Sequence, residues 1–134
     1  MDEYIPLLKF ISKYNECAKV RRGALIIDSE GNVISMGTIR NCPEAYEKCF
    51  NTKNYDCHSL HAEAHAISRA RSIPSGSQII HLKFDKEGEP VASTRSFCPS
   101  CIKLMHEQGI ESLWLLHSDG WTQYLVEEAY NSLY

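Results

Sequence analysis

Several features common in other protein classes are missing from this sequence. The chain has no apolar run near the ~20 residues that a transmembrane helix needs, and no internal repeat or low-complexity segment. Its first residues carry no basic stretch, and Lys9 and Lys13 interrupt the apolar residues that follow. A cleaved signal peptide would need both of those features. We therefore expect a cytoplasmic protein without a membrane partner.

An excess of positive charge is also missing. The 17 acidic and 14 basic residues give a net charge of -3, so no overall basic field would attract nucleic acid, although a local basic patch remains open. The 43% hydrophobic and 23% charged residues are typical of a soluble globular protein. At 134 residues, the chain is expected to form a single domain, 1–134.

Cysteine, in contrast, is abundant for this length, with six residues. In the cytoplasm cysteines act more often as metal ligands or free thiols than as disulfides. The chain has one Cys-x-x-Cys pair, Cys98 and Cys101, and no second pair that would complete a four-cysteine zinc site.

The spacing of apolar residues predicts helices that alternate with strands. This order favours an α/β fold with helices on both faces of the sheet. Residues 38–57 show no clear periodicity, which in a compact domain indicates a functional loop or one that is tied down. The predicted elements are a helix over 4–18, strands over 23–27 and 32–36, a helix over 59–71, a strand over 78–84, a helix over 98–108, a strand over 112–116 and a last helix starting at Trp121.

The segment His61-Ala-Glu63 and the Cys98–Cys101 pair each open a predicted helix. The two cysteines are spaced to bind one tetrahedral ion, and a histidine would make a third ligand. Three protein ligands leave the fourth position for water, as in catalytic zinc sites, where the ion lowers the pKa of water towards ~7. Glu63 is then placed to take a proton from that water and pass it to a leaving group.

His-x-Glu followed by Cys-x-x-Cys resembles the zinc-dependent cytidine and deoxycytidylate deaminases. The resemblance extends to Cys17–Ile26, which is similar to the entry into the family's first strand, and to Cys57–Ile67, which is similar to its metal-binding helix. It is closest to the deoxycytidylate branch. It implies a three-layer α/β/α sandwich with a mixed central sheet.

The resemblance also implies roles for single residues. His61, Cys98 and Cys101 would bind zinc, and Glu63 would move protons. The backbone N–H of Ala62 would bind the pyrimidine carbonyl. Asn41 would hold the sugar. Hydroxide would add to C4 of cytosine and ammonia would leave, most simply converting dCMP to dUMP.

The sequence departs from the family pattern in three places. Phe97 stands before Cys98 where the family usually has proline, and His65 stands where it usually has asparagine. Gly37 and Asn41 are four residues apart, unlike the family's usual Gly-x-Asn-Gly. These departures affect nucleotide binding rather than the metal ligands or Glu63.

Further charged and titratable residues have less specific interpretations. One of Arg21, Arg22 and Arg40 could bind a nucleotide phosphate. His65, one helical turn after His61, could bind metal, but an ordinary role on the helix surface is the simpler interpretation. Ordinary roles are also expected for the remaining histidines, namely His81, His106 and His117.

The other cysteines suggest a second, structural zinc that would hold the 38–57 loop. Some deoxycytidylate deaminases carry such an ion, and Cys17, Cys49 and His58 resemble its ligands, with Cys57 or Cys42 completing the set. Four buried thiols are the alternative, because free cysteine behaves as a small hydrophobic residue.

The expected function is deamination of a small pyrimidine nucleotide by a homo-oligomer. The same chemistry on a nucleoside, a base, a single-stranded nucleic acid or the target of a toxin-type domain is one alternative. A non-catalytic, zinc-stabilised interaction domain is another, but that role has no use for Glu63.

Overall fold

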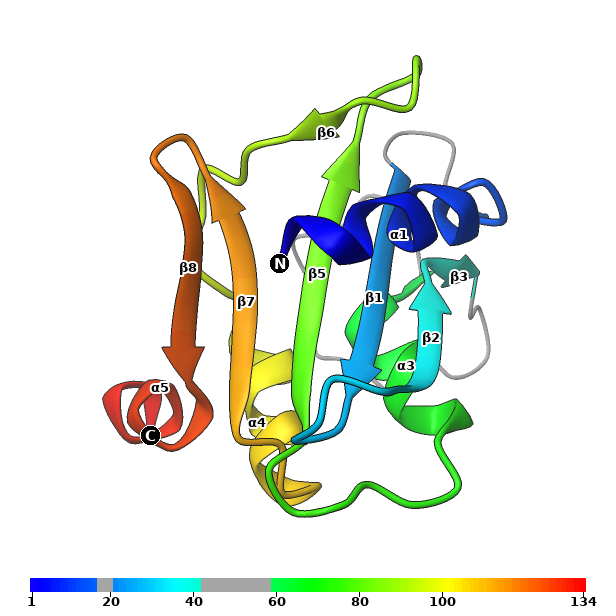
Figure 1. Cartoon of the computed structure of the whole chain (residues 1–134). Coiled ribbons are helices and arrows are strands. Elements are labelled where there is room, and N and C mark those ends of the chain that lie inside the picture. Colours follow the sequence, from blue (N-terminus) through cyan, green and yellow to red (C-terminus); the bar gives the residue numbers. More distant parts are fainter. Residues whose placement is uncertain (17–20, 42–58) are drawn as a thin grey trace.

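The computed structural model describes residues 1–16, 21–41 and 59–134, with Asn41 and Ser59 described as backbone. Its centre is a mixed sheet with the strand order β2-β1-β5-β7-β8, in which β6 pairs with the end of β5 (Figure 1). β5 and β7 run parallel, and the other pairs of this sheet are antiparallel. The strands are β1 (Arg21–Ile27), β2 (Val33–Thr38), β5 (Gln78–Phe84), β6 (Pro90–Val91), β7 (Ser112–His117) and β8 (Gly120–Leu125).

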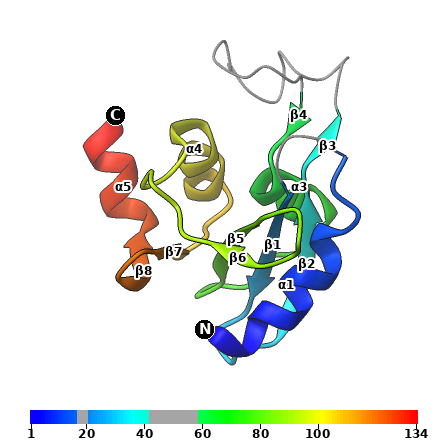
Figure 2. The ribbon, with the colours of Figure 1, turned by 90° about the horizontal axis from the view of Figure 1, so that it is seen from above.

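Helices cover both faces of this sheet (Figure 2). Helix α1 packs on one face, and α3, α4 and α5 lie on the other. The predicted three-layer sandwich with a mixed sheet is confirmed. The helices are the short 3₁₀ helix η1 (Asp2–Tyr4), α1 (Ile5–Ser12), α3 (Ala62–Arg69), α4 (Pro99–Glu107) and α5 (Val126–Leu133).

Successive side chains of β5 point alternately into two hydrophobic cores, one on each face of the sheet. Ile80 and Leu82 face α1, whereas Ile79 packs in the core formed with α3, α4 and α5. Because successive side chains of a strand point to opposite faces, His81 lies on the same face as Ile79. The central strand thus places one histidine beneath α3 and α4.

The first predicted helix is shorter in the structure than the sequence pattern indicated. It ends at Ser12, and residues 13–16 are not helical. The side-chain oxygen of Asn15 accepts the backbone N–H groups of Arg22 and Ile39, at 3.2 and 3.1 Å. Tertiary hydrogen bonds to β1 and to the residue between β2 and β3 therefore replace further helical turns.

The predicted last helix is present, but its predicted start at Trp121 was wrong, because it begins at Val126. Residues 120–125 form β8, which pairs with β7 through the hairpin turn at Ser118–Asp119. Gly120 has φ +120°, a conformation that favours glycine, and the following β-branched and aromatic residues suit a strand. The indole N–H of Trp121 donates to Asp2 at 2.7 Å rather than packing in a helix.

A second, small sheet adjoins the start of α3. It consists of β3 (Arg40–Asn41) paired with β4 (Ser59–Leu60), so that Arg40 is opposite Leu60. The chain from residue 42 to 58 between these strands lies outside the described residues. Within the described ranges, none of the helices is both long enough and apolar enough to cross a bilayer.

Candidate active site

The first turns of two helices bring the three predicted metal ligands together. His61 is the N-cap residue of α3, Cys98 is the N-cap residue of α4, and Cys101 follows in the first turn of α4. One ligand atom from each residue lies within 4.8 Å of the other two. His61 Nδ1 is 3.2 Å from Cys101 Sγ.

Local sequence explains these helix starts. Both N-cap residues have extended backbone, and Pro99, whose fixed φ suits a first helical position, follows Cys98 directly. Cys98 Sγ lies 3.2 Å from the hydroxyl of Ser100. The N-terminal ends of α3 and α4 also favour negative charge nearby, which suits Glu63 and thiolate ligands.

The pKa values of the three candidate ligands are shifted by their contacts with one another and with Glu63. The hydrogen bond from Cys101 and a further one from His61 lower the pKa of Cys98 to about 3. The same bond to Cys98, together with burial, raises the pKa of Cys101 well above its usual value. Burial alone would lower the pKa of His61, but hydrogen bonding to Cys98 and the charge of Glu63 outweigh it and raise that pKa.

This donor set fits zinc. Zinc takes imidazole nitrogen at ~2.0–2.1 Å and thiolate sulfur at ~2.3 Å, which places ligand atoms roughly 3.3–3.8 Å apart around a tetrahedral ion. The cluster of His61, Cys98 and Cys101 is close to that size, and Cys98 is already a thiolate. Three protein ligands also leave one position open.

Glu63 lies beside this group in the first turn of α3 and is 7% exposed. Its charge contributes to the raised pKa values of both His61 and Cys101. His81 faces it from β5, with Nε2 3.7 Å from Glu63 Oε1. Glu63 therefore lies close to both the metal-ligand group and a buried histidine.

His81 is the site residue that sequence reasoning missed. An ordinary role was predicted for it. Its local sequence, Ile-Ile-His-Leu, did hold a signal, because a titratable side chain in an otherwise apolar buried strand needs a partner. The partner, Glu63, is 18 residues earlier in the chain and could not be read from spacing.

The other histidines of the described residues have structural partners. His65 Nδ1 accepts the backbone N–H of Thr38 at 3.0 Å, and His65 is not part of the metal-ligand group. Burial, and then the charges of Arg40 and Arg69, lower the pKa of His65. His106 stacks on Tyr130 with ring centroids 3.9 Å apart.

His117 helps to hold the segment that leads into Cys98. Its Nδ1–H donates to the carbonyl of Ser93 at 2.8 Å, and its Nε2 accepts the hydroxyl of Tyr124 at 2.6 Å. Phe97 packs edge-on against Tyr124. An aromatic contact with β8 thus anchors the residue before Cys98, where the family pattern has proline.

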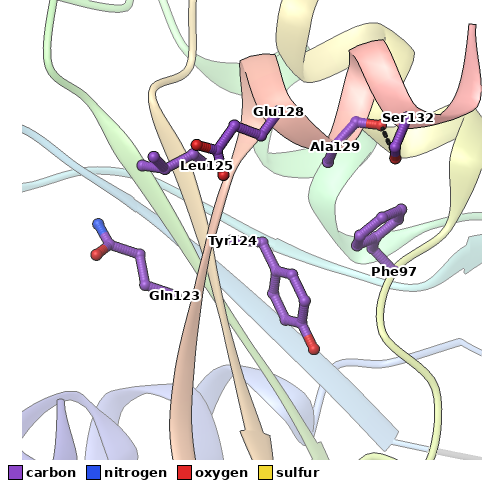
Figure 3. A pocket seen from close by; sticks show the side chains of 7 residues that line it. All are labelled: Phe97, Gln123, Tyr124, Leu125, Glu128, Ala129 and Ser132. Carbon is purple, nitrogen blue, oxygen red and sulfur yellow. Dashed lines mark hydrogen bonds between the residues drawn. The ribbon is translucent and has the colours of Figure 1, made fainter.

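A hollow of about 440 Å³ is lined by Phe97 and by residues of β8 and α5 (Figure 3). Neither Glu63 nor any of the three candidate metal ligands lines it, so it is separate from the candidate active site. The residues that line it are Phe97, Gln123, Tyr124, Leu125, Glu128, Ala129 and Ser132.

The three candidate phosphate-binding arginines differ in position. Arg22 shares a face of β1 with Ala24, which packs in the core beneath α3 and α4, and its charge lowers the pKa values of His61 and His81. Arg21 alternates to the face covered by α1. Arg40 forms an ion pair with Glu16, with Nη1 3.7 Å from Oε2.

The remaining predicted site residues are only partly described. Ala62 is the first residue of α3 and is fully buried, and the backbone of Asn41 lies in β3 beside the start of that helix. All the candidate ligands of the second zinc lie outside the described residues: Cys17, Cys42, Cys49, Cys57 and His58.

The profile of the cytidine and deoxycytidylate deaminase zinc-binding region matches residues 4–117. The chain belongs to this deaminase family. Membership makes it a hydrolytic deaminase of the cytidine or deoxycytidylate type. No curated protein sequence matches the deaminase.

Solved structures show the same fold at low sequence identity. The apo dCMP deaminase of cyanophage S-TIM5 is 19% identical with a TM-score of 0.59, over 98% of this deaminase and 90% of that chain. The cytidine deaminase of Burkholderia pseudomallei is 15% identical with a TM-score of 0.61, over 95% and 93%. The Mycobacterium leprae cytidine deaminase is 13% identical with a TM-score of 0.58, over 96% and 94%.

Proposed function

We propose that this deaminase acts on a pyrimidine nucleotide and converts dCMP to dUMP with release of ammonia. The observation that supports this most strongly is the group of His61, Cys98 and Cys101 with the buried carboxylate of Glu63 beside it. A structural metal site alone would not need a carboxylate next to an open ligand position.

His61, Cys98 and Cys101 would hold one zinc ion. When bound, zinc activates water for attack on an electron-poor carbon. Glu63 accepts the proton of that water and delivers it to N3 of the cytosine ring. After water has added to C4, Glu63 takes the proton of the new C4 hydroxyl group and passes it to the amino group. The C4–N bond then breaks, C4 becomes a carbonyl carbon, and ammonia leaves a uracil.

Backbone and loop groups would orient the pyrimidine. Ala62 is the first residue of α3, and the first four N–H groups of a helix have no partner within the helix. The N–H of Ala62 is therefore suited to bind the pyrimidine carbonyl. Asn41 would hold the sugar, because β3 runs beside β4 at the entry to α3, and Arg40 remains a candidate for binding the phosphate.

Of Arg21 and Arg22, Arg22 is the better candidate for binding the phosphate of the nucleotide. It lies on the face of β1 that carries the site, and its charge acts on both His61 and His81. The S-TIM5 dCMP deaminase, solved with dCMP and dUMP, shares the fold at 21% identity and a TM-score of 0.54. The net charge of -3 favours a small nucleotide over a long nucleic acid.

Ammonia release from a panel of cytosine compounds tests this proposal. The zinc-loaded protein is offered cytidine, dCMP, dCTP, cytosine and single-stranded DNA, and we expect the highest kcat/KM with dCMP. Preference for cytidine or single-stranded DNA would replace the substrate and leave the chemistry intact. Ammonia release from none of them would contradict the catalytic proposal.

A further inference from the structure

His81 occupies an unusual position for a polar side chain. It lies in the middle of the central strand β5, opposite Ala24 of β1 and Leu115 of β7. Its side chain is 6% exposed. Both neighbouring residues on this face are apolar, and burying a polar ring among apolar groups is unfavourable unless the ring has a polar partner.

The polar partner of His81 is Glu63. The Nε2 atom of the ring and Oε1 of the carboxylate lie 3.7 Å apart, and both side chains are buried. Burial lowers the pKa of His81 more strongly than the charge of Glu63 raises it. A neutral ring with its proton on Nε2 is a hydrogen-bond donor directed at one carboxylate oxygen.

We propose that His81 is a positioning residue for Glu63. A donor at Nε2 holds Oε1 and leaves Oε2 free to face the atoms that exchange protons. The 3.7 Å separation is longer than a hydrogen bond, but contacts of this kind often shorten when the substrate is bound. The proposal rests on the proposed role of Glu63 in proton transfer.

This arrangement separates two properties of the enzyme. Zinc would be bound by His61, Cys98 and Cys101, none of which forms the contact between His81 and Glu63. The substrate-binding groups are likewise different residues. Loss of the Nε2 donor should therefore lower kcat and leave KM and zinc content close to those of the wild type.

Three substitutions of His81 test whether a hydrogen-bond donor is needed at the position of Nε2. His81→Leu removes the donor and introduces an apolar side chain of similar size. We expect kcat to fall about 10–100-fold, as when hydrogen-bond partners of site residues are lost. His81→Gln places an amide N–H near the position of Nε2 and should recover most of kcat. His81→Asn has a shorter side chain, and its kcat should stay low.

Ile79→Val is the matched control, because Ile79 lies on the same strand and face two residues away. It should lower the unfolding temperature without changing kcat more than about twofold. Zinc content and unfolding temperature are measured for all variants. If His81→Leu does not fold, the difference between His81→Gln and His81→Asn still decides the question.

A double substitution identifies the residue through which His81 acts. Glu63→Asp draws the carboxylate away from His81, so adding His81→Leu to it should cost much less in kcat than in the wild type. Equal losses in both backgrounds, or a raised KM with unchanged kcat, would overturn the proposal.

The activity of Glu63→Gln distinguishes failure of the proposed function from failure of the positioning role of His81. Near-normal turnover by Glu63→Gln would refute the proposed function and this inference together. If Glu63→Gln is inactive while His81→Leu keeps the wild-type kcat, only the positioning role of His81 is wrong.

Discussion

Gly37 of β2 and Ala62 of α3 approach so closely that a β-carbon on Gly37 would collide with the carbonyl oxygen of Ala62. The same β-carbon would collide with the backbone nitrogen of Ala66, one turn further along α3. Nearby, the hydroxyl of Ser35 donates to the carbonyl of Ala66 at 2.6 Å. β2 thus sets the position of the helix that carries His61 and Glu63.

We expect Gly37→Ala to damage both stability and catalysis. The added methyl group must push α3 away from the sheet, at a cost of about 1–3 kcal/mol in the free energy of unfolding. Because His61 and Glu63 move with α3, kcat should also fall. Urea unfolding and steady-state kinetics measure the two effects.

Gly23→Ala is the control for this substitution. A β-carbon on Gly23 would lie 3.0 Å from the carbonyl oxygen of Leu8, on the face that α1 covers. It should lower stability while the folded fraction keeps its kcat. Equal losses of kcat for the two variants would show that the approach of β2 to α3 has no special part in the site.

The two neighbouring arginines of β1 should differ in their effect on nucleotide binding. Arg22→Gln should raise KM for dCMP by about 10-fold or more and change KM for deoxycytidine little, because a charged hydrogen bond to phosphate contributes about 1.5–3 kcal/mol. Arg21→Gln, on the opposite face of the strand, should leave both KM values unchanged. Equal effects of Arg22→Gln on the two substrates would contradict a phosphate contact.

Zinc affinity should rise with pH. The pKa of Cys101 is raised well above its usual value and that of His61 is also raised, so protons compete more strongly with zinc for these two ligands. Each proton released makes the apparent affinity about tenfold higher per pH unit. Cys98, with a pKa of about 3, is already a thiolate and adds no dependence near neutral pH. Competition with a chromophoric chelator between about pH 6 and pH 8 measures this slope, and an affinity independent of pH would contradict it.

A second zinc ion remains a prediction of the sequence. Ordering residues 38–57 costs ~1–2 kcal/mol per residue, and a structural zinc supplies about 10–16 kcal/mol. If Cys17, Cys49, Cys57 and His58 bind it, metal analysis should give two zinc ions per chain. Cys49→Ser should lose one of them, whereas Cys98→Ala should lose the other. One zinc ion in both the wild type and Cys49→Ser would leave the four cysteines as buried thiols.

The sequence predicted the parts of this molecule that depend on local pattern. Strands β1, β2, β5 and β7 follow from apolar runs, and the starts of α3 and α4 follow from His61 and Cys98–Pro99. β8 was missed because Trp121, Tyr124 and Leu125 suit a helix face as well as a strand. The pairing of β8 with β7 decided between the two.

The contact between His81 and Glu63 could not be predicted for a different reason. It depends on which face of β5 lies under α3, and that follows from the sheet order β2-β1-β5-β7-β8. The preference for Arg22 over Arg21 has the same origin, since one residue of shift along a strand reverses the face. Tertiary register rather than motif spacing determines both.

The most direct test of the account is the turnover of dCMP by Glu63→Gln. Glutamine keeps the size of the side chain but cannot take a proton, so the general acid–base contribution of about 10²–10⁴-fold should be lost. His61, Cys98 and Cys101 are unchanged, so the variant should hold as much zinc as the wild type. Conversion of cytosine to uracil is followed by absorbance, with metal content measured on the same samples. A zinc-loaded variant that turns over dCMP at a near-normal rate would contradict the assignment of Glu63, and with it the proposed mechanism.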